Sequence, residues 1–216
     1  MGALIAIDGP AGSGKSTLAR RLAVELGLPY VNTGLMYRAL AVRAVREGVD
    51  PDDGPALEVL ARSIGFSLDS TVEPPGLSID GRAPEEALTS PEVESTVSRV
   101  ARHPEVRAVL RDEQRRLGSG GAVMEGRDIG TVVAPGAPLK LFLVAHPQER
   151  VERRAQEREA HSKEIAEALE TRDALDARTN PLEPAGDAVE IDTTDLDPDE
   201  VLARALELAR QRGFAP

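Results

Sequence analysis

Short apolar runs and longer amphipathic stretches alternate along the chain. The apolar runs have the length of buried strands and fall at residues 3–7, 29–32, 122–125, 139–144 and 189–192. The stretches between and after them are typical of helices, at 14–27, 34–47, from 104 onward, 147–175 and 198–212. Strands that alternate with helices in this way predict a parallel sheet covered by helices.

The middle of the chain departs from this pattern. Residues 66–69 and 77–79 alternate as strands do, and the turn-forming sequence EPPG at 73–76 separates them. The pair Asp80-Gly81 then adds a strong hairpin signal. We therefore expect a small antiparallel sheet that is inserted into the parallel fold.

Composition and charge exclude several functions. The chain has 216 residues and a formal charge of −11, from 26 basic and 37 acidic side chains. Such an acidic protein is a poor general binder of nucleic acid, although a local basic pocket can still hold a small anion. The absence of cysteine excludes disulfides, thiolate metal sites and a cysteine nucleophile. The longest apolar run, at 139–145, is too short to span a membrane, and no secretion signal precedes the first strand, so we expect a cytoplasmic protein.

The clearest motif lies at residues 9–16, where GPAGSGKS matches the pattern G-x-x-x-x-G-K-[ST] at every position. It follows a predicted strand and begins a predicted helix, as its mechanism requires. The glycines allow the backbone to curl, so that successive N–H groups and the helix N-terminus surround a phosphate. In such a loop Lys15 reaches the β- and γ-phosphates, and Ser16 can ligate Mg²⁺. The motif therefore predicts a nucleoside triphosphate site.

Three classes of protein use this loop: small-molecule kinases, GTPase switches, and motors or ATPase modules. A GTPase needs an Asn-Lys-x-Asp element, but the two asparagines of the chain, Asn32 and Asn180, are followed by Thr and Pro. A motor ATPase generally needs an apolar run that ends in an acidic magnesium ligand, whereas the run at 139–144 ends in Ala145-His146. The sequence therefore favours a kinase.

A kinase also needs a second anion site that faces the glycine-rich loop. Arginine suits this site because a guanidinium grips phosphate through two hydrogen bonds. Arg38 and Arg127 each follow a predicted strand, where loops gather over the carboxyl ends of a parallel sheet. Two glycines bracket Arg127-Asp128, which makes a poor packing motif but a good binding loop. The charged stretch near the C-terminus, about half of which could equally be a solvated helix with i, i+4 ion pairs, adds Arg150, Arg153, Arg154, Arg158, Arg172 and Arg178.

Four stretches of the chain together resemble the family of bacterial cytidylate kinases. They are residues 7–17 (IDGPAGSGKST), 32–38 (NTGLMYR), 125–133 (EGRDIGTVV) and 172–176 (RDALD). The spacing between them is kept over nearly the whole chain, and the string GRDIGTVV is quite specific. Glu125 stands where the family commonly has aspartate.

This resemblance implies a nucleoside monophosphate kinase with a three-layer α/β P-loop kinase fold. The fold would have a five-stranded parallel sheet in a core at about 1–62, 104–146 and 182–216. A small antiparallel β insertion would belong to the monophosphate-binding region at about 63–103, and a helical lid would span about 147–181.

The implied reaction is ATP-dependent phosphorylation of CMP and dCMP to CDP and dCDP, with release of ADP and with Mg²⁺ as cofactor. We expect a monomer, since this reaction needs no second subunit. Two alternatives stay open: a P-loop kinase for another nucleotide or a small metabolite, and a nucleotide-binding module without enzymatic activity.

The resemblance also assigns roles by position. ATP would be held by Gly9, Pro10, Ala11, Gly12, Ser13, Gly14, Lys15, Ser16, Thr17 and Arg154, with Ser16 as the metal ligand. The acceptor base would be held by Thr33, Ser98, Arg107 and Asp128, the sugar by Arg172 and Asp176, and the acceptor phosphate by Arg38, Arg127 and Arg178. Tyr37 would pack against the base or sugar, or lie in the core. The catalytic set would be Lys15, Arg127, Asp128 and Arg178.

Overall fold

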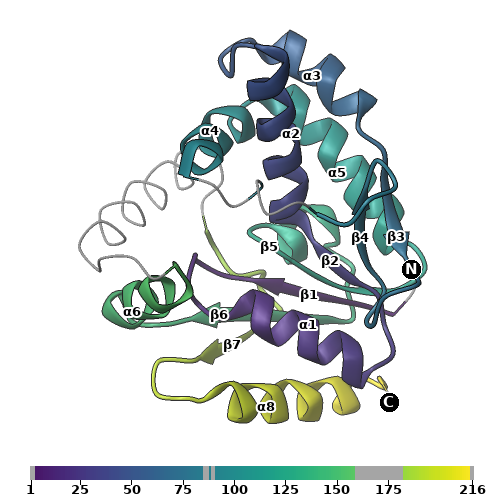
Figure 1. Ribbon diagram of the computed structural model, residues 1–216. Coiled ribbons are helices and arrows are strands. Elements are labelled where there is room, and N and C mark those ends of the chain that lie inside the picture. Colours follow the sequence, from purple (N-terminus) through teal and green to yellow (C-terminus); the bar gives the residue numbers. More distant parts are fainter. Residues whose placement is uncertain (1–2, 85–87, 89–90, 159–181, 215–216) are drawn as a thin grey trace.

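A seven-stranded sheet forms the centre of the protein, in the order β3-β4-β2-β5-β1-β6-β7 (Figure 1). The computed structural model describes residues 3–84, 88, 91–158 and 182–214. Each neighbouring pair of strands is parallel except β3 with β4, which is antiparallel. The strands are β1 (Leu4–Asp8), β2 (Tyr30–Asn32), β3 (Phe66–Asp69), β4 (Gly76–Ile79), β5 (Ala122–Gly126), β6 (Leu139–Val144) and β7 (Val189–Asp192).

The predictions of a parallel sheet between helices and of an antiparallel pair formed by residues 66–69 and 77–79 are confirmed, but the expected five-stranded parallel sheet is wrong, because the sheet has seven strands and is mixed. The hairpin of β3 and β4 belongs to the main sheet. Tyr30 pairs with Gly76 in parallel register, and its backbone N–H donates to the Pro75 carbonyl oxygen at 2.8 Å. This pairing covers the edge of β2, which would otherwise present unpaired backbone groups to solvent.

Both faces of the sheet are covered, which explains why the central strands β1, β5 and β6 are mostly apolar. In β1, Ile5 and Ile7 join one hydrophobic core, whereas Leu4 and Ala6 join the other, as the two-residue period of a strand requires. The first core lies under α1 (Lys15–Glu25) and α8 (Pro198–Gln211). The second lies under α2 (Thr33–Glu47), α3 (Gly54–Ser63), α4 (Pro91–Ala101) and α5 (Pro104–Gly118), which gather on the opposite side in Figure 1.

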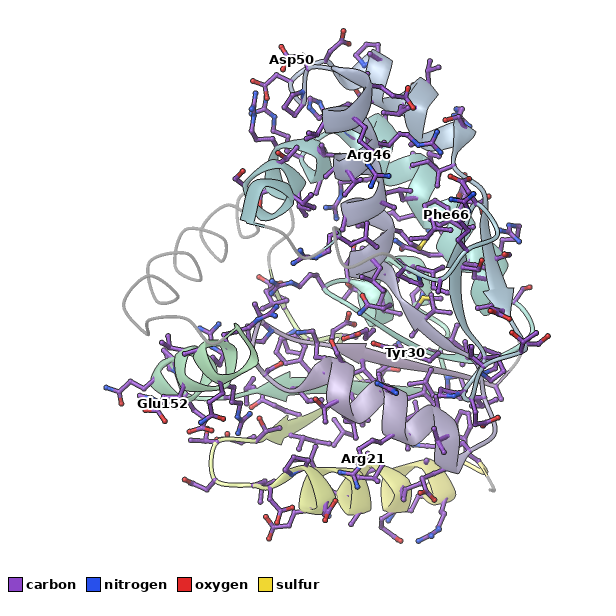
Figure 2. All side chains as sticks on the ribbon, viewed as in Figure 1. Arg21, Tyr30, Arg46, Asp50, Phe66 and Glu152 are labelled. Carbon is purple, nitrogen blue, oxygen red and sulfur yellow. The ribbon has the colours of Figure 1, made fainter. Side chains whose placement is uncertain are left out.

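The start of α8 is fixed by its own sequence. The Asp197 carboxylate accepts hydrogen bonds from the backbone N–H groups of Asp199 and Glu200, and the Glu200 side chain accepts one from the backbone of Asp197. This reciprocal capping arrangement satisfies donors that the first turn of a helix leaves unpaired. Arg21 of α1, labelled in Figure 2, pairs with Asp199 at 2.5 Å and joins the two helices on this face.

Two further helical elements follow strands of the sheet. The π-helical turn η2 (Ile129–Val133) follows β5, and α6 (Pro147–Arg158) follows β6. Neither η2 nor α3 was predicted from the sequence. The predicted helix at 147–175 is confirmed as α6 over its first part, and residues 159–175 lie outside the described residues. Within the described part of the chain, every helix is too short or too polar to span a membrane.

Candidate active site

The glycine-rich loop joins β1 to α1. Its backbone has φ of +147° at Gly9, +76° at Gly12 and +85° at Gly14, conformations that L side chains rarely adopt. A Cβ at Gly9 would lie 2.2 Å from the Leu143 carbonyl oxygen. A Cβ at Gly12 would lie 2.8 Å from the carbonyl oxygen of Arg150. Glycine is therefore required here both for the backbone path and for lack of space.

Lys15 and Ser16, the first residues of α1, lie beside the end of β5. The Ser16 hydroxyl donates to Glu125 Oε2 at 2.9 Å, and Lys15 Nζ donates to the Pro10 carbonyl oxygen at 2.5 Å. Glu125 is only 3% exposed. Burial raises the pKa of its carboxyl, and the positive charges of Lys15 and Arg154 oppose this rise. A hydroxyl and a carboxylate oxygen thus lie together beside a phosphate-binding loop, a donor set that suits Mg²⁺.

The position of Glu125 shows that the prediction of no acidic residue at the end of an apolar strand was wrong. The acidic residue that was sought at the end of residues 139–144 lies instead at the end of β5, the other neighbour of β1. The apolar run Ala122–Met124 followed by Glu125 was the signal for it. An acidic residue beside Ser16 is compatible with a kinase and with an ATPase, so the choice between them depends on the acceptor side of the site.

A chain of side-chain hydrogen bonds from β2 holds Glu125. The Tyr30 hydroxyl donates to Glu125 Oε1, and Asn32 Nδ2 donates to the Tyr30 oxygen at 3.2 Å. Because Asn32 supplies a hydrogen to this oxygen, the hydrogen of Tyr30 is directed at the carboxylate. Burial and the neighbouring charge of Glu125 raise the pKa of Tyr30, so the hydroxyl keeps its proton. Tyr30, labelled in Figure 2, was not among the predicted site residues.

Asp8, the last residue of β1, connects the glycine-rich loop with the loop that follows β5. Its Oδ1 accepts from the backbone N–H of Ile129 at 2.8 Å, and its Oδ2 accepts from that of Gly130 at 2.7 Å. Burial raises the pKa of Asp8 to about 6, although both hydrogen bonds act in the opposite direction. The two hydrogen bonds from Ile129 and Gly130 to Asp8 hold the preceding Arg127-Asp128 pair close to Gly9.

Arg127, which was predicted to hold the acceptor phosphate, lies beside the glycine-rich loop. Its Nη1 donates to the Gly9 carbonyl oxygen at 3.4 Å, which places a guanidinium against the glycine-rich loop. Arg38, on α2, is 7% exposed and donates through Nη1 to the Leu88 carbonyl oxygen at 2.9 Å. Arginine is seldom this deeply buried in a fold without a specific partner or role.

The predicted base-binding residues Asp128 and Arg107 contact each other. Arg107 Nη2 lies 3.0 Å from Asp128 Oδ2. A second arginine that the sequence argument missed, Arg111, lies 2.7 Å from the same oxygen. Thr33 lies close by, because its hydroxyl donates at 2.7 Å to the carbonyl oxygen of Glu125, three residues before Asp128.

Tyr37 and Ser98 are the other two residues that were predicted for the acceptor base or sugar, and their contacts with the pocket are less direct. Tyr37 packs on the hydrophobic core, and its pKa is raised by burial, with the charges of Arg107 and Asp128 also acting on it. Both interpretations of Tyr37, a core residue and a pocket residue, are therefore compatible with its position. Ser98 is half-buried on α4, which packs on α2 and α5.

Among the arginines of α6, Arg150 contacts the glycine-rich loop directly and Arg153 contacts it through Thr193, while Arg153 also forms an i, i+4 ion pair with Glu149 at 2.9 Å. Arg150 Nη1 donates to the Ala11 carbonyl oxygen at 3.1 Å. Arg153 Nη2 donates to the Thr193 carbonyl oxygen at 2.6 Å, and the Thr193 hydroxyl donates to the Ser13 carbonyl oxygen at 3.3 Å. Arg154 is near enough to act on the charge of Glu125. The predicted residues Arg172, Asp176 and Arg178 lie outside the described residues.

The fold and its loop place the chain among the kinase-like P-loop α/β proteins, and arginines gather around the loop after β5. The sequence model of the family named cytidylate kinase matches residues 5–211. The chain therefore belongs to the cytidylate kinase family.

Curated relatives agree with this family over nearly their whole length. The chain is 44% identical over 213 residues to the cytidylate kinase of Exiguobacterium sibiricum, which covers 95% of this chain and 96% of that protein. It is 42% identical to the cytidylate kinase of Caldanaerobacter subterraneus subsp. tengcongensis, over 96% of this chain and 94% of that one. It is 45% identical to the cytidylate kinase of Pelotomaculum thermopropionicum, over 92% of each chain.

Proposed function

We propose that this protein transfers the γ-phosphoryl group of ATP to CMP, and also to dCMP, with ADP and CDP or dCDP as products. The observation that carries the proposal is the contact between Arg127 and the Gly9 carbonyl oxygen, which places an acceptor-side guanidinium against the loop for the donor phosphates. Asp8 reinforces this proximity by binding the backbone after Asp128.

On the donor side, backbone N–H groups of the glycine-rich loop and of the start of α1 surround the β-phosphate, and Lys15 swings from the Pro10 carbonyl oxygen to the β- and γ-phosphates. Arg154 adds positive charge near the same point. Ser16 and Glu125 would hold Mg²⁺ together with the phosphates. In the described part of the chain, no group of three His, Asp or Glu side chains is placed to hold a metal ion by itself. When bound, Mg²⁺ neutralises the charge that develops on the transferred group.

On the acceptor side, cytosine is recognised by its hydrogen-bonding pattern. Asp128 Oδ1 makes no hydrogen bond within the described structure and so can accept from the 4-amino group of the base. Thr33, Ser98 and Arg107 satisfy the remaining polar edge. We assign Arg172 and Asp176 to the sugar, and Arg38, Arg127 and Arg178 to the acceptor phosphate. A site built for this pattern discriminates against other bases, because they leave its buried groups unpaired.

The chemical step needs positioning more than it needs a base. The acceptor phosphate is already anionic near neutral pH, so its oxygen can attack the γ-phosphorus in line without a strong general base. Lys15, Arg127 and Arg178 neutralise charge as the phosphoryl group passes from donor to acceptor. The proposed lid at 147–181 closes over ATP and excludes water, which would otherwise hydrolyse it.

The proposed division of the chain follows from these roles. Residues at about 1–62, 104–146 and 182–216 form the core, those at 63–103 serve the monophosphate, and those at 147–181 serve as lid. One copy of the chain supplies both proposed substrate sites, so we propose a monomer. We also propose that the protein works in the cytoplasm.

A coupled assay of ADP release with CMP, dCMP, UMP, AMP and dTMP tests the proposal. We expect turnover with CMP and dCMP above that with the other three. Preference for AMP or dTMP would reassign the substrate, and release of ADP with none of them would favour a nucleotide-binding module.

Replacement of Asp128 by Ala tests the acceptor pocket. Asp128→Ala should raise the KM for CMP about tenfold or more while the KM for ATP changes little, because a charge-assisted hydrogen bond to the base is lost. Asp112→Ala, on the exposed face of α5, is the matched control. Equal increases in both KM values would show that the base pocket lies elsewhere.

A further inference from the structure

Two arginines of α5, one helical turn apart, converge on a single oxygen. Arg107 Nη2 lies 3.0 Å and Arg111 Nη2 lies 2.7 Å from Asp128 Oδ2. The three side chains are 12%, 23% and 12% exposed, so water screens their charges only partly. One carboxylate with one guanidinium would be neutral, and the second guanidinium leaves this cluster with an excess positive charge.

Stability alone gives no reason for the second arginine. Arg111 Nε is buried and has no hydrogen-bond partner within the described structure, and a buried donor without a partner costs free energy. An apolar side chain of similar length would fill the same space without this cost. A buried polar group without a partner needs an explanation, and a role in function is one such explanation.

The geometry fixes which atom of Asp128 is available. Both guanidinium groups donate to Oδ2, and no hydrogen bond within the described structure reaches Oδ1. Because both guanidinium groups donate to Oδ2, Oδ1 is the carboxylate oxygen left to accept a hydrogen bond from a ligand.

We infer that Arg111 is a specificity-determining residue, which holds Asp128 as a fixed acceptor and so selects cytosine over uracil. The inference rests on the proposed function. Cytosine presents an amino donor at position 4, whereas uracil presents a carbonyl acceptor at the same position. A carboxylate accepts from the amino group but repels the carbonyl, and it could pair with uracil only after taking up a proton. Arg111 acts through Asp128 and not by touching the substrate, so it is a positioning residue.

The test compares CMP and UMP as acceptors for Arg111→Met. This change removes the guanidinium but keeps a long, unbranched side chain. The ratio of kcat/KM for CMP to that for UMP should fall about tenfold, mainly through a higher KM for CMP, while the KM for ATP stays near that of the unchanged protein. Arg111→Lys retains a positive charge within reach of Oδ2 and should restore part of the ratio.

Arg116→Met is the matched control. It removes an arginine from the same helix, but Arg116 bonds Glu113 and the Phe66 carbonyl oxygen and does not contact Asp128. Its CMP-to-UMP ratio should match that of the unchanged protein. If Arg111→Met does not fold, which its thermal unfolding curve reports, the ratio is measured on Arg111→Lys, for which we then expect a smaller decrease.

A ratio in both Arg111 variants equal to that of Arg116→Met would overturn the role of Arg111 but leave the CMP kinase proposal intact. An unchanged protein that transfers phosphate to neither CMP nor dCMP would overturn the proposed function, and this inference with it.

Discussion

The buried carboxyl of Asp8 makes the stability of the protein depend on pH in a direction opposite to that of most acidic residues. Its pKa is raised from 3.8 to about 6, mainly by burial. The unfolded chain therefore releases this proton near pH 4, whereas the folded chain keeps it until about pH 6. Asp8 contributes most to stability below pH 4, and this contribution is lost as the pH rises through 6.

The magnitude follows from the size of the pKa change. At about 1.4 kcal/mol for each pH unit, a rise from 3.8 to about 6 corresponds to about 3 kcal/mol in the free energy of unfolding. About 2 kcal/mol of this lies between pH 4 and pH 7. Asp8→Asn removes the titration. The Asn amide can accept only one of the two backbone hydrogen bonds, and the loss of the other costs about 1 kcal/mol. Because this cost is the same at every pH, it cancels when the free energies of unfolding at two pH values are compared.

The assay is urea unfolding of both proteins, followed by circular dichroism at pH 4, 5, 6 and 7. The free energy of unfolding of Asp8→Asn, relative to the unchanged protein, should rise by about 2 kcal/mol from pH 4 to pH 7. Asp69→Asn is a control of opposite sign, because hydrogen bonds from Thr71 lower the pKa of the exposed Asp69. If the free energy of unfolding of Asp8→Asn relative to the unchanged protein does not vary with pH, the reasoning is refuted. If this relative free energy falls from pH 4 to pH 7, the two hydrogen bonds outweigh burial in setting the pKa of Asp8.

Two further substitutions test the loop and its support. Gly9→Ala places a Cβ 2.2 Å from the Leu143 carbonyl oxygen and should lower the free energy of unfolding by about 3 kcal/mol or more, whereas Gly27→Ala, which has φ of +60° but open space, should cost only about 1 kcal/mol. Equal costs in thermal or urea unfolding would mean that backbone conformation, and not lack of space, dominates at Gly9. Tyr30→Phe leaves Glu125 Oε1 without its donor and should cost about 1–3 kcal/mol of stability and raise the Mg²⁺ concentration needed for half-maximal activity several-fold. An unaltered Mg²⁺ titration would separate Tyr30 from metal binding.

Some parts of the site could be predicted from the sequence because local chemistry specifies them. The glycines of residues 9–14 are needed for a particular backbone path, and the glycines around Arg127-Asp128 predict a binding loop from local sequence alone. Other parts depend on which strands and helices become neighbours. Arg107 and Arg111 are visibly one turn apart in the sequence, but their meeting with Asp128 depends on how α5 packs beside η2.

The pairing of β4 with β2 could not be predicted from the sequence for a similar reason. An antiparallel hairpin is recognisable from its turn, whereas the edge on which it docks is a long-range choice that its own residues do not reveal. The same holds for Asp8 and Glu125, which stand at the ends of apolar runs. Their partners Ile129, Gly130, Ser16 and Tyr30 become apparent only when β1, β2 and β5 lie side by side.

Tyr30 occupies a junction between two parts of the molecule. Its main chain carries the attachment of the β3–β4 hairpin, through Pro75 and Gly76, while its phenol ring supports Glu125 beside Ser16. Any displacement of the hairpin would therefore act on Glu125 through one rigid aromatic residue. Lengthening or crosslinking this peripheral hairpin would alter the surroundings of Glu125 and Ser16 without touching any residue of the glycine-rich loop.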